Sequence, residues 1–284
     1  MVRIYVDSTQ DLSPAQIAEN NIKVIPLYVS LGTEKNGRDG VEITRDMIYE
    51  WADRTKDTPK TAAFSPADAM DALEEAKEAG DDVIFIGISM DFSSVCNVVR
   101  LAAEDMEYED HVFVVDSRNL STGIGLVVLE AVKKVKEGKS APEIVEHLND
   151  VIPRVRASFI IDTLVYLSRG GRCSSVTALL AGSLKLRPMI AVKDGKMSVV
   201  KPYRGKRLPV LLKYAKDLEE QMLNAEEDVC FVTHSGNPEE EAEAVKEYVE
   251  SLGHFKNVYI TDAGSVISSH CGPATLGVLF IAKH

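Results

Sequence analysis

The sequence predicts an α/β protein with two α/β domains. Short runs of apolar and β-branched residues alternate with amphipathic helical patterns along almost the whole chain. Most of these runs are nearly continuous in apolar residues, which is typical of parallel strands covered on both faces. Two later runs are joined by Asp194-Gly195, a strong hairpin signal. We therefore expect a mostly parallel N-terminal sheet with flanking helices, and a C-terminal α/β domain with an inserted β-hairpin.

The individual elements follow from these periodicities in chain order. The expected strands are Val2–Asp7, Ile22–Leu31, Asp82–Ser89, His111–Asp116, Ala157–Asp162, Asp228–His234, Val258–Asp262 and Gly277–Ala282, with the hairpin over Pro188–Val200. The expected helices are Pro66–Ala79, Leu120–Glu137, Ala141–Ile152, Leu208–Asn224 and Pro238–Leu252. In the last helix, Pro238 suits the first turn and the apolar positions recur at helical spacing.

The boundary between the two domains is expected near Pro153–Ala157, where a polar helix gives way to a new strand. This divides the chain into residues 1–155 and 156–284. No low-complexity segment or long linker separates them, so the two parts are expected to pack closely.

Composition excludes several classes of protein. The 284 residues are 45% hydrophobic and 27% charged, with a net charge of -12, so attraction to nucleic acids or anionic membranes is not expected. No apolar run approaches the roughly 20 residues of a membrane span, and the N-terminus resembles a strand rather than a signal peptide. Four widely spaced cysteines indicate reduced thiols, and hence a cytoplasmic protein without a zinc site.

Polar residues gather where the predicted strands end. Asp7-Ser8-Thr9, Ser89–Ser94 and Asp116-Ser117 each follow a strand, and Thr61 lies just before a helix. In an open parallel sheet such ends converge on one crevice, where hydroxyls and helix amides suit a carboxylate or phosphate. The alternative is that each cluster only caps the helix that follows it.

His270 lies in the turn-like segment Ser268–Pro273, between two apolar runs. An imidazole among small polar residues is a candidate contact for an anionic group. The alternative is a surface histidine in an ordinary loop.

Basic residues form a second candidate group. In this acidic chain, five of them could form one patch for an anion or an acidic partner, or simply a solvated surface. They are Arg169, Arg172, Arg204, Lys206 and Arg207.

Common catalytic motifs are missing from the sequence. We find no GxGxxG after the first strand, no Walker lysine and no GxSxG elbow. His234 and His270 would lack two further metal ligands. The residues alone thus indicate a polar crevice in a two-domain α/β protein without visible catalytic machinery.

Taken together and in order, short segments spread over the whole chain resemble the DegV family of bacterial fatty-acid-binding proteins. These segments are Asp7-Ser8-Thr9-Gln10-Asp11-Leu12, Asp39-Gly40-Val41-Glu42-Ile43, Thr61 with Ser65-Pro66, Ser89–Ser94, Val115-Asp116-Ser117, Thr163–Arg172, Lys185-Leu186-Arg187-Pro188, Arg204-Gly205-Lys206 and His270-Cys271-Gly272-Pro273.

The resemblance implies a long-chain fatty acid, such as palmitate, held between the domains with its tail in the C-terminal one. It implies that Thr61, Ser93 and His270 contact the carboxylate. It further implies a carrier that is not an enzyme and needs no cofactor or metal. The carrier would present the acid to a separate ATP-dependent fatty acid kinase, a dihydroxyacetone-kinase-like protein, which makes acyl phosphate for phospholipid synthesis. Arg172 and Arg204 would face that partner.

The tail is expected to supply most of the affinity, at ~0.8 kcal/mol for each buried methylene. Candidate lining residues lie in Phe159–Leu167, Leu179–Ile190 and Val278–Ile281, although ordinary core is the alternative for each of them.

The chain departs from the family pattern at three places. Ala62-Ala63 follows Thr61 where a hydroxyl is usual, Ser94-Val95 replaces Gly-Thr, and Arg187 replaces a common Lys. The first two bear on the head-group contacts or on the preferred ligand.

Two other functions fit the same residues. The chain could be the substrate-binding subunit of a dihydroxyacetone-kinase-like phosphotransfer system, with His270 on a small carbonyl compound. It could also be a regulatory module that holds lipid as a structural plug. A long tunnel would favour the carrier, and a small cavity the phosphotransfer subunit.

Overall fold

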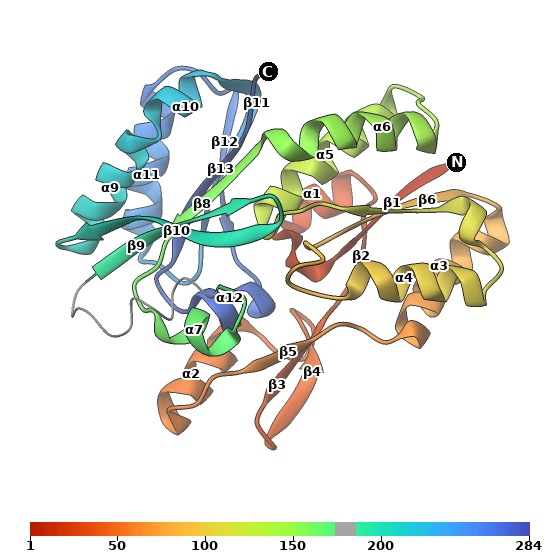
Figure 1. Cartoon of the computed structure of the whole chain (residues 1–284), viewed down its shortest axis with the longest axis horizontal. Coiled ribbons are helices and arrows are strands. Elements are labelled where there is room, and N and C mark those ends of the chain that lie inside the picture. The colour runs from red at the N-terminus through yellow and green to blue at the C-terminus, as the bar shows by residue number, and fades with distance from the viewer. Residues whose placement is uncertain (174–185) are drawn as a thin grey trace.

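The computed structural model describes residues 1–173 and 186–284 and confirms the α/β class (Figure 1). From β1 to α6 the elements are β1 (Val2–Asp7), α1 (Pro14–Glu19), β2 (Lys23–Ile25), β3 (Tyr28–Leu31), β4 (Lys35–Arg38), α2 (Arg45–Thr55), β5 (Lys60–Ala62), α3 (Pro66–Ala79), β6 (Asp82–Gly87), α4 (Val95–Asp105), β7 (Val112–Asp116), α5 (Thr122–Lys136) and α6 (Ala141–Val151), with short 3₁₀ turns at Ser8–Gln10 (η1), Glu109–His111 (η2) and Ile152–Arg154 (η3). We call this the N-terminal part.

The remaining elements form the C-terminal part. They are β8 (Val155–Ile160), α7 (Val165–Gly170), β9 (Leu186–Lys193), β10 (Lys196–Arg204), α9 (Arg207–Asp217), α10 (Glu219–Leu223), β11 (Ala225–His234), α11 (Glu239–Ser251), β12 (Asn257–Asp262), α12 (Ser265–Cys271) and β13 (Leu276–Ala282). The helix expected over Leu208–Asn224 is thus two helices that meet at Leu218. None of the described helices is long and apolar enough to cross a bilayer.

The N-terminal part contains the predicted parallel sheet. Its strand order is β2-β1-β6-β7, and every pair is parallel. From Val83 to Gly87 the central strand β6 is buried, as its continuous apolar run predicted. The carboxyl ends of β1 and β6 lie side by side, which brings the polar residues after each strand to one edge.

A small three-stranded sheet, ordered β4-β3-β5, was not predicted. The expected strand Ile22–Leu31 is in fact two strands, because β2 joins the parallel sheet and β3 pairs with β4 and β5. Pro26 lies between them, where the missing N–H suits a break in the ladder. With α2, this sheet lies below α7 and α12 in Figure 1 and carries Thr61 on β5.

The C-terminal part is built on a mixed six-stranded sheet in the order β10-β9-β8-β13-β11-β12. Only the pair β11 and β12 is parallel, and the apolar run Gly277–Ala282 contains β13, which is antiparallel to both of its neighbours, β8 and β11. That run is apolar because β13 is covered on both faces. Leu279 and Ile281 belong to one core cluster, whereas Val278 and Phe280 belong to the other.

The hairpin prediction is confirmed by antiparallel pairing of β9 with β10. Asp194 and Gly195 form its turn with φ of 50° and 82°, the left-handed conformation that such turns require. The tip reaches the N-terminal part, where Ser89 Oγ donates to the carbonyl oxygen of Gly195 at 2.8 Å. A side chain at position 195 would overlap that hydroxyl.

The segment around His270 differs most from the prediction. Ser265–Cys271 forms helix α12, and His270 lies in its last turn rather than in a loop. The helix ends at Gly272, whose φ is 77°. It packs against α2 and α7, so its conformation depends on residues that are distant in the sequence.

Candidate functional site

Three predicted contact residues meet in one cavity of about 160 Å³, which we call the head-group cavity. Thr61 comes from β5, Ser93 from the loop before α4, and His270 from α12. His270 Nε2 and Thr61 Oγ1 are 2.7 Å apart, a hydrogen-bonding distance. Arg172 also lines the cavity, although the resemblance assigned it to a partner surface.

Ser93 is placed by a network at the ends of β1 and β6. Asp7 Oδ2 accepts a hydrogen bond from the Ile88 amide at 2.7 Å, which holds the start of the loop. The Ser93 amide then donates to the carbonyl oxygen of Ser89 at 3.1 Å. Helix α4 begins at Val95, so its free amides and the positive end of its dipole lie next to Ser93. This arrangement favours an anionic group.

His270 is neutral at pH 7 in this environment. Burial, and to a smaller extent the positive charge of Arg172, lowers its pKa to about 4. Its Nδ1 atom is buried, without a hydrogen-bond partner in the described part of the chain, and packs against Gly170. A methyl group at position 170 would overlap that nitrogen, so this glycine permits the close approach.

Arg172 is the one cation among the described residues that line the head-group cavity. Its Nη1 donates to the carbonyl oxygen of Gly170 at 2.6 Å, and the residue remains exposed. The cavity thus offers an anion two hydroxyls, a neutral imidazole and one guanidinium.

A second cavity, of about 50 Å³, is adjacent to the first and is almost entirely apolar. Both cavities are lined by Leu120, Met197, Ile267 and His270, so His270 lies where the two meet. We call this the tail cavity. It draws mainly on β8, β11, β13 and the two helices α7 and α12. Its apolar lining includes Phe159, Leu167, Ala263, Cys271 and Leu279.

The sequence located only part of this lining. Phe159, Leu167 and Leu279 fall within the expected ranges. Residues 179–185 of the expected range Leu179–Ile190 lie outside the described residues, and none of 186–190 lines the cavity. Leu120, Met197 and Ile267 were missed, because nothing in their local pattern separates them from ordinary core residues.

The departures from the family pattern lie at the head-group cavity. Ala62, Ala63 and Ser94 line it, so the lost hydroxyl and the altered loop border the place where a ligand would lie. Arg187 is instead paired with Asp162 at 2.6 Å, outside both cavities.

The expected basic patch does not form one group. Arg204 is exposed at the end of β10, away from both cavities. Arg169 donates to Thr58 Oγ1 at 3.2 Å, and Arg207 is paired with Glu241 at 2.7 Å.

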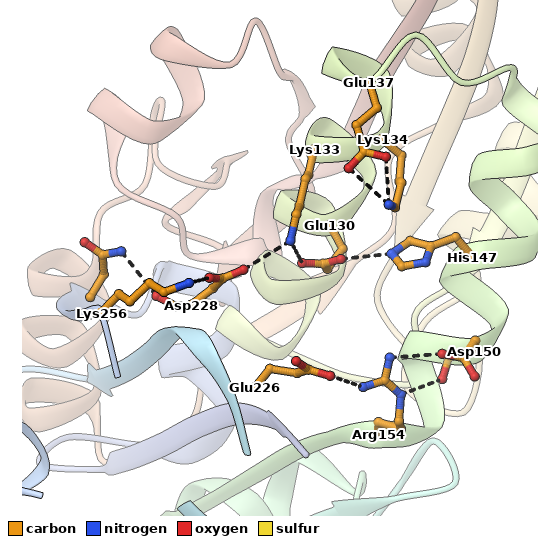
Figure 2. Close-up of polar contacts among 11 residues, drawn as sticks. Glu130, Lys133, Lys134, Glu137, His147, Asp150, Arg154, Glu226, Asp228 and Lys256 are labelled. Atoms are coloured by element: carbon orange, nitrogen blue, oxygen red, sulfur yellow. Dashed lines mark hydrogen bonds and ion pairs between the residues drawn. The ribbon is translucent and has the colours of Figure 1, made fainter. Parts of the chain in front are cut away.

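A third cavity, of about 220 Å³, lies between α5, α6 and β11 and has a different character. Figure 2 shows its charged side chains joined in pairs, with Glu130 on His147 and Lys133 on Asp228. Arg154 contacts Glu226 in the same way at 3.0 Å. The pairs Lys133–Asp228 and Arg154–Glu226 join the two parts of the chain, whereas Glu130–His147 joins α5 to α6. Because these charges satisfy one another, they do not offer a ligand site. No cluster that could hold a metal ion occurs among the described residues.

Comparison with known proteins identifies relatives over the full length. The family model described as "Uncharacterised protein, DegV family" matches residues 1–283. A DegV domain-containing protein of Deinococcus radiodurans is 34% identical over 279 residues, covering 98% of this chain and 97% of that protein. One from Caldanaerobacter subterraneus subsp. tengcongensis is 30% identical and covers 99% of each.

Solved structures agree with the fold. A DegV family protein from Thermus thermophilus, described as fatty-acid-binding, superposes with a TM-score of 0.91 at 28% identity and covers 99% of both chains. A stearic-acid-binding protein from Eubacterium ventriosum gives 0.87 at 28% identity, covering 100% of this chain and 99% of that one. The family match and the shared fold both extend over almost the whole chain, and the protein therefore belongs to the DegV family.

Proposed function

We propose that this protein binds one long-chain fatty acid, with the carboxylate in the head-group cavity and the hydrocarbon in the tail cavity. The observation that carries the proposal is that the two cavities are adjacent and share four lining residues, His270 among them. A polar site beside an apolar one matches the two ends of a fatty acid. The volume of the tail cavity, about 50 Å³, would by itself favour the small-molecule alternative, so the proposal requires that this cavity widen as a long chain enters. The relatives from Thermus thermophilus and Eubacterium ventriosum, described as fatty-acid-binding and stearic-acid-binding, support it.

The carboxylate would be satisfied mostly by neutral donors. A desolvated carboxylate without partners costs several kcal/mol, so binding requires hydrogen bonds to its oxygens. The hydroxyls of Thr61 and Ser93 can each donate one. If His270 Nε2 donates to Thr61 Oγ1, the hydroxyl proton of Thr61 is free for the ligand. Arg172 would add the compensating positive charge.

The tail would enter beside Met197, which lines both cavities. An unbranched thioether side chain adapts its shape readily, so Met197 can move as the chain enters. In this proposal residues 1–155 supply the two hydroxyl contacts to the head group, and residues 156–284 supply His270 and Arg172 and hold the tail.

We further propose that the protein is a cytoplasmic carrier rather than an enzyme. It would present the bound carboxylate to a separate ATP-dependent fatty acid kinase. The exposed residues Arg172 and Arg204 would lie on the side that meets this partner.

Ligand content tests the first part of the proposal. Protein purified without added lipid is denatured and extracted, and the extract is examined by mass spectrometry. The purified protein is then titrated with octadecanoic acid. We expect one equivalent of fatty acid. An empty preparation that also fails to bind octadecanoic acid, but binds dihydroxyacetone, would replace the proposal with a small-molecule phosphotransfer subunit.

Reconstitution tests the carrier role. The loaded protein is incubated with a fatty acid kinase and ATP, and acyl phosphate is measured. Turnover of the bound acid is the expected result. A bound acid that is never phosphorylated would instead indicate a structural lipid in a regulatory module.

A further inference from the structure

Helix α12 is held at its beginning by two buried carboxyl groups of the N-terminal part. Asp11 Oδ1 accepts a hydrogen bond from the Gly264 amide at 2.8 Å. Asp39 Oδ1 accepts from the amides of Ser265 at 2.8 Å and Val266 at 3.3 Å.

These contacts replace a local cap. The residue before the helix is Gly264, which has no side chain to accept from the first amides. A helix of seven residues is also too short to be stable alone. The start of α12 is therefore determined by acids that are more than 220 residues away in the sequence.

The two acids are themselves fixed in place. Ser121 Oγ donates to Asp11 Oδ2 at 2.5 Å, and Ser8 Oγ donates to Asp39 Oδ2 at 2.7 Å. Asp11 is only 6% exposed and Asp39 only 4%. Burial raises the pKa of both carboxyls, and that of Asp11 reaches about 8. Acids in such surroundings depend on the hydrogen bonds they accept.

The other end of α12 carries His270, which contacts Thr61 of the N-terminal part. His270 lies five residues after Ser265, or ~7.5 Å along the helix axis. A short helix moves as a unit, so a displacement at its beginning displaces the imidazole at its end. Helix α12 of the C-terminal part is thus held by the N-terminal part at both ends.

We propose that Asp11 and Asp39 are positioning residues for the head-group site, which act by fixing α12 and hence His270. This inference rests on the proposed function, because it assigns the two acids to the binding of the fatty acid carboxylate. It also couples the site to the contact between the two parts of the chain.

The affinities for two ligands show whether a variant disturbs the head-group site or the tail cavity. Octadecanoic acid has a carboxylate and octadecan-1-ol does not, while their tails are the same length. We expect Asp39→Ala to weaken binding of the acid about 10-fold or more, and binding of the alcohol much less. Asp39→Asn keeps an acceptor oxygen for the helix amides and should restore most of the affinity.

The matched control is Asp81→Asn. Asp81 is equally buried and holds Arg3 and the N-terminal amine, far from α12. This variant measures the effect of losing a buried carboxylate elsewhere in the N-terminal part, and should leave the affinity for the acid unchanged. The ¹⁵N resonances of the His270 imidazole should shift in Asp39→Ala and stay in place in Asp81→Asn.

A double-mutant cycle completes the test. If Asp39 acts through His270, then Asp39→Ala combined with His270→Ala should cost no more affinity than His270→Ala alone. Additive losses, or unchanged His270 resonances in Asp39→Ala, would overturn the inference.

Should Asp39→Ala not fold, Ser8→Ala removes the hydroxyl that fixes Asp39 and is tested in the same way. Wild-type protein that binds no octadecanoic acid would refute the proposed function itself, which is a different outcome.

Discussion

The head-group cavity and the tail cavity are built in different ways. Thr61, Ser93 and His270 come from a small sheet, a loop and a short helix, which meet only through long-range contacts. The tail cavity lies against neighbouring strands of one sheet, where β8 contributes Phe159 and β13 contributes Leu279, and helices α7 and α12 add Leu167, Ile267 and Cys271. We infer that the apolar tail cavity supplies affinity through burial, while the polar head-group cavity supplies selectivity for a carboxylate.

Shortening the ligand should change the Kd most, because it removes methylenes that would be buried in the tail cavity. Removing four methylenes, from octadecanoic to tetradecanoic acid, should cost ~3 kcal/mol, or about 200-fold in Kd. Calorimetric titration of both acids measures this difference. Equal affinities would mean that the tail lies outside the protein. The inference that the tail cavity supplies the affinity would then be wrong.

Removing the imidazole tests the head-group cavity. His270→Ala should weaken binding of octadecanoic acid by ~10- to 100-fold, since a hydrogen bond to a charged group contributes ~1.5–3 kcal/mol. Thr61→Ala should act in the same direction.

His254→Ala is the control for this substitution. His254 Nε2 contacts the carbonyl oxygen of Ala225, away from both cavities. If His254→Ala and His270→Ala weakened binding equally, the assignment of His270 would be wrong.

Gly170→Ala tests whether the position of His270 matters. Alanine normally stabilises a helix relative to glycine by ~1 kcal/mol, but a methyl group here would displace the imidazole. We expect about 10-fold weaker binding of the acid. Val165→Ala, at an exposed position of the same helix, is the comparison. Unchanged binding by Gly170→Ala would show that the imidazole can move without loss.

The smallest effect, at most ~1.4 kcal/mol for each pH unit, is expected in the pH dependence of the free energy of unfolding. The pKa of His270 falls from 6.5 to about 4 on folding, so its contribution is present above pH 6.5 and is lost as the pH falls toward 4. The pKa of Asp11 rises from 3.8 to about 8, so its contribution is complete below pH 3.8 and is lost progressively as the pH rises to 8. Between pH 4 and 6.5 the contributions of His270 and Asp11 therefore change in opposite directions. Asp7 and Asp39 face Asp11, and Arg172 faces His270.

Denaturant unfolding between pH 4 and 9 measures both contributions. Relative to wild type, His270→Gln should lower the slope of the free energy of unfolding against pH by at most ~1.4 kcal/mol per pH unit between pH 4 and 6.5, and Asp11→Asn should raise that slope by a similar amount up to pH 8. Identical profiles for wild type and His270→Gln would contradict a buried neutral imidazole.

Much of the secondary structure could be predicted from the local pattern of apolar and turn residues. The apolar run of β6 identified a buried parallel strand, and Asp194-Gly195 identified the hairpin turn. The same pattern could not give the direction of β13, because a run covered on both faces is apolar in either direction. It also missed β4 and β5, whose short and partly polar sequences carry no periodic signal.

The sequence by itself determined the α/β class, the hairpin and, through the ordered family motifs, the three residues that meet in the head-group cavity. Tertiary structure alone decided that His270 lies on a helix, since Asp11 and Asp39 supply the cap that Gly264 cannot. It also decided that the imidazole is neutral, because burial lowers its pKa. The helical conformation and the neutral state of His270 both depend on contacts between distant segments, which cannot be predicted from local periodicity.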